Sequence, residues 1–366
     1  MTVGSSHLVG FAHSSGWLRA LQAAGLVVWL AIPAVGLLTQ SQAGRIVWTV
    51  ILVWLPLLIV LIGYHRWRTI CPLAWLNQLP GHLRQASTRR MPRWLERHYY
   101  YVPLVIFTAC LWLRLIWIND DGTGIAVFFI GLSLVAIGVG ELTTGKTWCN
   151  YLCPVMFIEK IYTEPCGLQR TANSRCYPCT ACKRVCPDID QTKAYWKEID
   201  LPSKRIAYFA YPGLVVGFYM CDSAAAGWFF LPWIPRAAAA LVTLVASAGI
   251  SWAIFARGVM PLVSWRLERN QLTSDKRSLA LGIAAFTAFI AFYFFALQQA
   301  MPKSDWLLIP ADLLTLCVAT ASLVRRLAAI SPKRPIADPS FVPPRDHMFL
   351  PRESVRIGIA RLRQRG

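Results

Sequence analysis

Charge is scarce in this chain. Only 15% of its 366 residues are charged, against about 25% in soluble domains, and the mean hydropathy is +0.45. Acidic residues are the scarcer kind, with 18 Asp and Glu against 37 Lys and Arg and a net charge of +19. A soluble protein so basic would suggest a nucleic-acid partner. In a chain this apolar, basic residues are instead expected to flank membrane helices, so no nucleic-acid partner is expected.

Histidine is also rare, and several cofactor motifs are missing. A haem held inside a membrane needs histidines within the apolar segments, and all six lie outside them: His7, His13, His65, His82, His98 and His347. There is no C-x-x-C-H for haem c. There is no P-loop, and no G-x-G-x-x-G that follows a strand. No haem, flavin or nucleotide site is therefore expected.

Long apolar runs are abundant. A membrane helix needs about 20 apolar residues to cross a hydrocarbon core of about 30 Å. Eight segments approach that length, which predicts an all-α integral membrane protein: 20–39, 46–63, 101–119, 125–143, 206–222, 236–256, 278–298 and 306–324. The fifth contains Pro212-Gly213 and is followed by a second apolar run, 224–234, so a kinked or re-entrant segment is an alternative there.

The distribution of Lys and Arg predicts the orientation. The loop 64–100 holds seven, the region 144–205 ten, the loop 257–277 five and the tail after 324 ten. The other loops hold only Arg45, Arg236 and Lys303. The positive-inside rule places both termini and the basic loops in the cytoplasm of a bacterial inner membrane. Four regions follow: helices 1–143, a polar insertion 144–205, helices 206–324 and a basic tail 325–366.

An internal repeat relates the first two helix pairs. A shift of 82 residues places segment 20–39 on 102–121 and segment 46–63 on 128–145. The same shift places Cys71-Pro72 on Cys153-Pro154, and a short amphipathic run follows each of them, 73–79 and 155–161. A shift by two helices preserves orientation, so both Cys-Pro sites are expected on the cytoplasmic face.

Cysteine carries the strongest motif. The run Cys176-x-x-Cys179-x-x-Cys182-x-x-x-Cys186-Pro187 has the spacing of bacterial ferredoxins, in which the fourth cysteine ligates a different [4Fe–4S] cluster from the other three. A structural zinc site is the alternative, but zinc typically uses two C-x2-C pairs separated by a longer loop. The spacing favours a cluster.

Eight of the eleven cysteines are expected on the cytoplasmic side, which is the number that two clusters need: Cys71, Cys149, Cys153, Cys166, Cys176, Cys179, Cys182 and Cys186. The other three, Cys110, Cys221 and Cys317, lie in or at the ends of apolar segments and are assigned to packing. If the ligands are shared as in bacterial ferredoxins, Cys176, Cys179 and Cys182 bind the first cluster with Cys153 as the fourth ligand. Cys186 then joins Cys149, Cys166 and Cys71 in the second cluster. Cys71 and Cys153 can exchange these roles.

The stretch Thr147-Trp148-Cys149-Asn150-Tyr151-Leu152-Cys153-Pro154 resembles the C-x3-C-P motif of membrane-anchored polyferredoxins. These include the NapH-type quinol-oxidising subunits, the NosR-type flavoproteins and the accessory ferredoxin of cbb-type oxidases. The resemblance covers roughly residues 20–195 and implies electron transfer. Three features differ from the family. Trp67 stands where a first C-x3-C-P would begin, only one ferredoxin run is present, and the outer flavin domain is absent.

The resulting prediction is a membrane-bound electron-transfer protein, an electron carrier or oxidoreductase subunit rather than a stand-alone enzyme. Its partners would be the lipid bilayer and a redox protein, namely ferredoxin, flavodoxin or a membrane oxidoreductase subunit, with the quinone pool as another carrier. An assembly reductase for a respiratory metalloenzyme is one alternative. A redox-sensing regulator that acts through the tail is another. The tail ends in a basic amphipathic run, 352–365, which either contacts anionic lipid or is a solvated end.

Several charged residues have two readings. Arg114 lies inside the third segment, where a charge suggests function, but snorkelling toward Asp120 or Asp121 is favoured. Glu141 either relays protons or pairs with Lys146 at the interface. A basic group beside the cysteine run either steers an acidic partner or reflects only the positive-inside bias: Lys183, Arg184, Lys193, Lys197, Lys204 and Arg205.

Overall fold

The computed structural model describes residues 16–52, 54–55, 58–59, 67, 70–83, 92–119, 121–143, 147–156, 202–228 and 233–269, and then 280, 282–284, 286–291, 293, 310, 313–321 and 324. Every regular element within these ranges is a helix, as the apolar segments predicted. Three helices are long and apolar enough to cross a membrane: Arg19–Thr39, Gly122–Leu142 and Trp233–Trp265.

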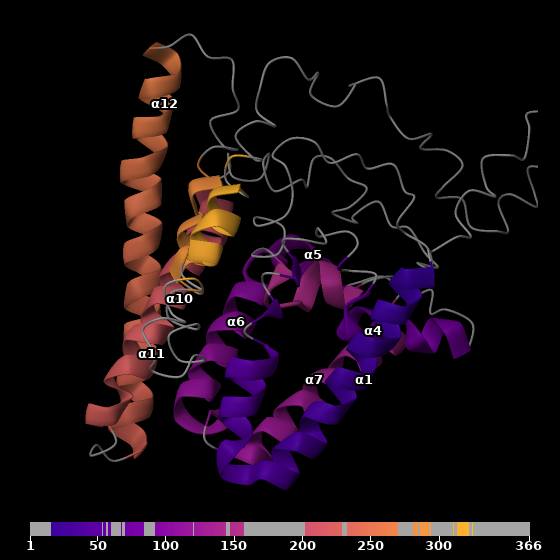
Figure 1. Cartoon of the computed structure of the whole chain (residues 1–366). Coiled ribbons are helices and arrows are strands. Elements are labelled where there is room, and N and C mark those ends of the chain that lie inside the picture. Colours follow the sequence, from indigo (N-terminus) through magenta and orange to yellow (C-terminus); the bar gives the residue numbers. More distant parts are fainter. Residues whose placement is uncertain are drawn as a thin grey trace, which may run out of the picture.

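The first half of the chain forms a group of helices around two long ones (Figure 1). In chain order its elements are α1 (Gly16–Thr39), η3 (Gln40–Gln42), η4 (Arg45–Ile51), α4 (Pro72–Leu83), α5 (Arg93–His98), α6 (Val102–Leu113), η5 (Arg114–Ile118), α7 (Gly122–Leu142) and η6 (Trp148–Leu152). The segments expected at 20–39, 101–119 and 125–143 correspond to α1, to α6 with η5, and to α7.

Helices α1 and α7 cross closely because both carry glycine at the crossing. A Cβ atom added at Gly36 would collide with the carbonyl oxygen of Gly122, and one added at Gly122 would collide with that of Gly36. Farther along, the indole Nε1 of Trp29 donates to the Ser133 hydroxyl at 2.9 Å. The Trp29 ring lies 4.7 Å from that of Phe129. Close backbone approach and one polar contact thus fix how these two helices pack.

Helix α4 packs against α7, although it lies in a stretch expected as a cytoplasmic loop. Its Asn77 is buried and donates through Nδ2 to the carbonyl oxygen of Ala136 at 2.9 Å. The buried face of α4 includes Ala74 and Leu76. The amphipathic run expected at 73–79 is therefore a helix, and it is part of the bundle.

The second half contains α10 (Pro202–Trp228), α11 (Trp233–Ala253), η8 (Ile254–Val259) and α12 (Met260–Arg269). Helix α10 continues through Pro212-Gly213, so the chain stays helical at the position where a kinked or re-entrant segment was the alternative. Its neighbour α11 comes very close, because a Cβ atom added at Gly213 would collide with the carbonyl oxygen of Ser247. In addition, Ser251 donates to the Phe209 carbonyl oxygen at 2.7 Å.

Helix α10 is not among the three membrane-length apolar helices, although it has 27 residues. Residues 207–215 are all buried, which shows that protein covers this stretch on every side. A helix that is buried all round lies in a core. The tyrosines and Pro212 make α10 less apolar than a helix that faces lipid.

The sixth expected segment, 236–256, continues into a much longer helix than the sequence suggested. Helices α11, η8 and α12 follow one another without interruption to Arg269, so the first half of the expected loop 257–277 is helical. The 33 residues from Trp233 to Trp265 span about 50 Å at 1.5 Å per residue. The π-helical turns of η8 end just before Pro261, and such wide turns are a known way to accommodate a local irregularity in a helix. Figure 1 shows α12 extending beyond its neighbours.

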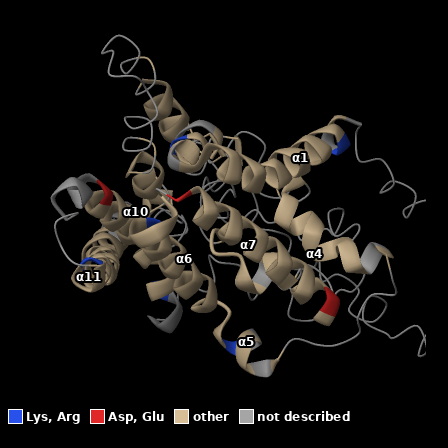
Figure 2. Ribbon diagram, turned by 90° about the horizontal axis from the view of Figure 1, so that it is seen from below, with Lys and Arg blue, Asp and Glu red and all other residues tan. Residues whose placement is uncertain are grey.

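Few charged side chains lie on the described helices (Figure 2). The second, seventh and eighth expected segments are described only in part. Most of the run after Pro154, most of the insertion 144–205 and the whole tail 325–366 lie outside the described residues.

Candidate metal centre

Cys71 lies at the start of α4. Its backbone N–H donates to the Trp67 carbonyl oxygen at 2.7 Å, and its own carbonyl oxygen accepts from Trp75 at 3.1 Å. Pro72 is the first residue of α4. Proline suits this position because its φ angle is already helical and its missing N–H would have had no partner in the first turn. The Cys-Pro pair therefore places a thiol at the beginning of a helix.

Cys149 and Cys153 lie on the π-helical turn η6 and at its end. The Cys153 N–H donates to the Trp148 carbonyl oxygen at 2.8 Å. Cys153 itself leaves the helical region, with φ −59° and ψ 117°, as expected for a residue that precedes proline. A spacing of four residues keeps both side chains on one face of a helical turn. The C-x3-C-P motif thus presents two thiols from one short turn.

All three described ligand candidates belong to one hydrophobic cluster. Cys149 is buried in it with Ala74, Ala136 and Trp148, while Cys71 and Cys153 pack against its edge. None of these three described cysteines forms a disulfide. The structure therefore brings together the two Cys-Pro sites, which the sequence separates by 82 residues. The other five candidates, Cys166, Cys176, Cys179, Cys182 and Cys186, lie outside the described residues.

The three cysteines do not make a metal site alone. Among the described residues, no three His, Cys, Asp or Glu side chains are grouped so that they could hold a metal ion. Their chemistry nevertheless suits an iron–sulfur cluster, which takes thiolate ligands. Trp148, only 2% exposed, has an indole Nε1 without a hydrogen-bond partner among the described residues. A buried indole N–H beside cysteines is a group that can donate to sulfur, so the described part of the site fits a cluster.

Trp67 occupies the position where a first C-x3-C-P motif would begin. It is 6% exposed and packs with Ile59, Ile70 and Cys71. An indole cannot ligate iron as a thiolate does. The first Cys-Pro site therefore contributes one ligand candidate, and hydrophobic packing takes the place of the second.

Tyrosines surround the second Cys-Pro site. The Tyr99 ring lies 6.0 Å from that of Tyr151 in η6 and 5.6 Å from that of Tyr100. Tyr100 in turn lies 4.4 Å from Tyr101. These contacts place η6 against the start of α6.

Tyr211 of α10 is a site residue that the sequence analysis missed. It is 1% exposed, and its hydroxyl donates to the carbonyl oxygen of Pro154 at 3.1 Å. A buried tyrosine usually needs a hydrogen-bond partner. Its presence in an apolar segment was therefore a signal, although the sequence does not name the partner.

Arg114 lies at the other end of α6 and does not reach toward Asp121, so that part of the snorkelling prediction is wrong. Its Nε donates to the side-chain oxygen of Asn119 at 3.2 Å. Its guanidinium carbon lies 4.0 Å from the centre of the Trp48 ring and 4.5 Å from that of Phe218. The Asn119 amide donates to Asp222 of α10 at 3.2 Å. We call Arg114, Asn119, Asp222, Trp48 and Phe218 the arginine clamp.

Asp121 caps a helix instead of pairing with Arg114. Its oxygens accept from the backbone N–H groups of Thr123 and Gly124 and from the Trp117 indole. The carboxylate therefore caps the N-terminus of α7, where the helix leaves backbone donors unpaired. Asp120, the other expected partner of Arg114, lies outside the described residues.

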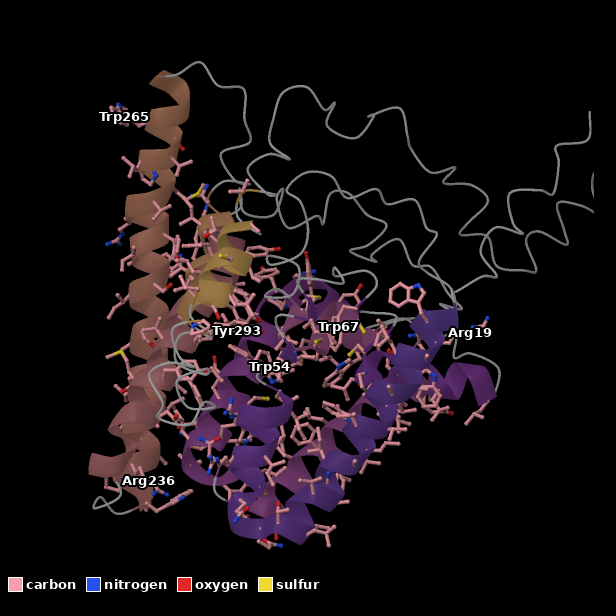
Figure 3. All side chains as sticks on the ribbon, in the orientation of Figure 1. Arg19, Trp54, Trp67, Arg236, Trp265 and Tyr293 are labelled. Carbon is pink, nitrogen blue, oxygen red and sulfur yellow. The ribbon has the colours of Figure 1, made fainter. Side chains whose placement is uncertain are left out.

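Further contacts at the clamp end join the two halves of the chain. Trp112 Nε1 donates to the Ala237 carbonyl oxygen at 2.8 Å, and Arg236 donates to that of Ile116 at 3.4 Å. Figure 3 labels Arg236 at the lower end of the second half, with Trp67 and Trp265 above it. Helix α6 thus carries the tyrosine contacts of the cysteine site at its start and the arginine clamp at its end.

The remaining sequence candidates have mixed outcomes. Cys221 is buried and Cys110 half-buried, in agreement with a packing role. Cys317 is exposed, so packing within the chain does not describe it. Glu141 is exposed near the end of α7. Its expected partner Lys146 and the basic group 183–197 lie outside the described residues.

Comparison with known proteins adds no relative, because no protein-family model, no curated protein and no solved structure matches the chain.

Proposed function

We propose that the chain is a membrane-bound electron-transfer protein with two [4Fe–4S] clusters on the cytoplasmic face of a bacterial inner membrane. The observation that carries the proposal is the meeting of Cys71, Cys149 and Cys153 in one hydrophobic cluster. The two Cys-Pro sites are 82 residues apart in the sequence, and both contribute a cysteine to this cluster. The ferredoxin run supplies the other ligands, and the polyferredoxin resemblance is consistent with this arrangement.

The proposed topology has eight membrane spans, with both termini inside and the cysteine-rich insertion between the fourth and fifth. Three apolar helices of membrane length support it, together with the bias of Lys and Arg toward one set of loops. In this arrangement Arg114 lies toward the outer face and the cysteines at the inner face.

The chain's own residues would hold and shield the clusters. The clusters supply reversible one-electron chemistry. Cys71, Cys149 and Cys153 would bind iron from the bundle side, while the insertion contributes Cys166, Cys176, Cys179, Cys182 and Cys186. Trp148 would donate its N–H toward sulfur. Ala74, Leu76 and Ala136 exclude water, and low polarity and hydrogen bonds to sulfur are what set a cluster's potential. Electrons would pass between a cytoplasmic carrier or the quinone pool and a membrane partner.

The test is an anaerobic purification in detergent, with iron and acid-labile sulfide counted per chain and EPR spectra recorded after dithionite reduction. Two cubanes predict about eight iron and eight sulfide. Cys71→Ser and Cys153→Ser should each lose iron, whereas Cys317→Ser, the matched control on an exposed helix position, should retain it. Zinc without sulfide would refute the proposal, as would full iron content in Cys71→Ser.

An electron carrier and a redox sensor differ in turnover. A carrier sustains electron flow from a reduced donor, and deletion of 331–366 should leave that flow intact. If the deletion abolishes the response to oxidant while no sustained flow is measurable, the sensor alternative holds instead.

A further inference from the structure

We infer that Tyr211 is a positioning residue for the Cys153 thiol of the proposed iron–sulfur site, because its hydroxyl bonds to the Pro154 carbonyl oxygen and fixes the turn that carries Cys153. The inference rests on the proposed function and deepens it. It concerns one hydrogen bond, from Tyr211 to the Pro154 carbonyl oxygen, between residues 57 apart in the sequence.

The bond ties the C-x3-C-P turn to a second helix. Tyr211 lies in α10, whereas Pro154 directly follows Cys153 at the end of η6. A contact that fixes the Pro154 carbonyl oxygen against α10 therefore also fixes the position of Cys153. In the proposed function, Cys153 is one of the ligands on the bundle side.

The turn at Cys153 needs such a contact. Pro154 has no N–H and cannot donate a hydrogen bond to hold the turn. The backbone bonds nearby, from Cys153 to Trp148 and from Met156 to Cys153 at 3.2 Å, act within the same short segment. They do not fix the turn to any other helix. Tyr211 does, through its hydrogen bond to the Pro154 carbonyl oxygen.

Tyr211 is itself held firmly. Its ring lies 5.2 Å from that of Phe107 in α6. The flanking residues of α10 are fixed to α11, since Ser251 bonds to the Phe209 carbonyl oxygen and Gly213 lies against Ser247. The phenol is thus anchored on two helices before it reaches Pro154, as a positioning group must be.

The test compares the wild type with Tyr211→Phe in the full chain. Phenylalanine keeps the ring that packs on Phe107 and removes only the hydroxyl. Tyr293→Phe is the control, because Tyr293 is equally buried in the same hydrophobic cluster and stacks on Phe289 at 4.6 Å. Figure 3 labels Tyr293.

The first readout uses protein stripped of iron, so it does not depend on the clusters. The alkylation rate of each cysteine by a maleimide is measured by peptide mass spectrometry. Loss of one hydrogen bond should raise the rate at Cys153 about two- to tenfold, while Cys71 is unchanged. Equal acceleration at all cysteines would show general loosening and overturn the inference, as would an unchanged rate at Cys153.

The second readout uses the loaded protein. A two- to tenfold change in the redox equilibrium corresponds to a shift of about 18–59 mV for a one-electron couple. In a redox titration of Tyr211→Phe followed by EPR, the midpoint potential of one of the two centres should shift by this amount, and that of the other should not. If both centres of the variant had the same midpoint potentials as in the wild type, the inference would be contradicted. If the wild type binds no iron, the proposed function fails, and the alkylation rates still decide whether Tyr211 fixes the turn.

Discussion

The arginine clamp offers the sharpest test of how the two halves of the chain are joined. Replacing Arg114 by Met removes a cation that lies between two aromatic rings and is linked through Asn119 to Asp222. The link to the Asp222 carboxylate runs through the Asn119 amide, and a hydrogen bond to a charged group contributes about 1.5–3 kcal/mol. A desolvated cation–π contact contributes about 2 kcal/mol, and the two effects overlap. We therefore expect Arg114→Met to destabilise the chain by about 3 kcal/mol.

Asp222→Asn should destabilise the chain for the same reason, since it leaves the arginine without its carboxylate. The double variant lacks both charges. Its loss should be smaller than the sum of the two single losses by at least about 1 kcal/mol, because groups that share one network couple by about 0.5–3 kcal/mol.

The assay is thermal unfolding of the purified protein in detergent, followed as the fraction that still elutes as a monodisperse peak after heating. At about 2 °C per kcal/mol for a large chain, Arg114→Met should lower the midpoint by about 6 °C. Arg257→Met is the matched control, because Arg257 is an exposed arginine of η8, and it should change the midpoint little. Strictly additive losses in the double variant would refute the clamp, as would equal effects of Arg114→Met and Arg257→Met.

Three further predictions follow from the packing and the topology. Gly36→Ala should destabilise the crossing of α1 and α7 by more than about 1 kcal/mol. Gly131→Ala is the control and should be neutral or stabilising, because a Cβ atom added at Gly131 meets no atom within 4 Å. Similar thermal midpoints for the two variants would contradict the close crossing. Trp29→Phe removes the bond to Ser133 and should cost about 0.6 kcal/mol beyond lost packing, so in a Ser133→Ala background the same change should cost less. Green fluorescent protein fused after Gly366 should fluoresce in the cytoplasm, and alkaline phosphatase inserted after Gly122 should be active outside; the reverse pattern would invert the proposed orientation.

The sequence predicts the long apolar helices well. Helices α1 and α7 match their expected segments to within a few residues, since each is an uninterrupted apolar run and the structure ends it at a polar or capping residue. Asp121, for example, caps α7 with its carboxylate. Where burial, length and a local capping residue all agree, no long-range information is needed to find the helix.

The sequence misses features that depend on a neighbour distant in the chain. Basic residues around α4 indicate a loop, but they do not reveal that Asn77 bonds to Ala136 of α7. Arg114 has carboxylates six and seven residues ahead, and these suggest snorkelling. The aromatic rings that enclose it come from η4 and α10. The role of Tyr211 likewise depends on a carbonyl group 57 residues away.

Trp67 bears on how many clusters the chain can hold. The loops proposed to be cytoplasmic contain eight cysteines, and two cubanes need about eight thiolates. Because an indole replaces the second thiol at the first Cys-Pro site, no cysteine is spare. If Cys71 were only a packing residue, seven thiols would remain, and one cluster would need a ligand that is not cysteine. Cys71 packs against the same hydrophobic cluster as Cys149 and Cys153, although it belongs to an earlier helix pair. That placement supports the proposal that Cys71, from the first Cys-Pro site, supplies a ligand to the cluster bound at the second Cys-Pro site. It is the reason why Cys71→Ser, rather than any change in the ferredoxin run, is the decisive variant for the second cluster.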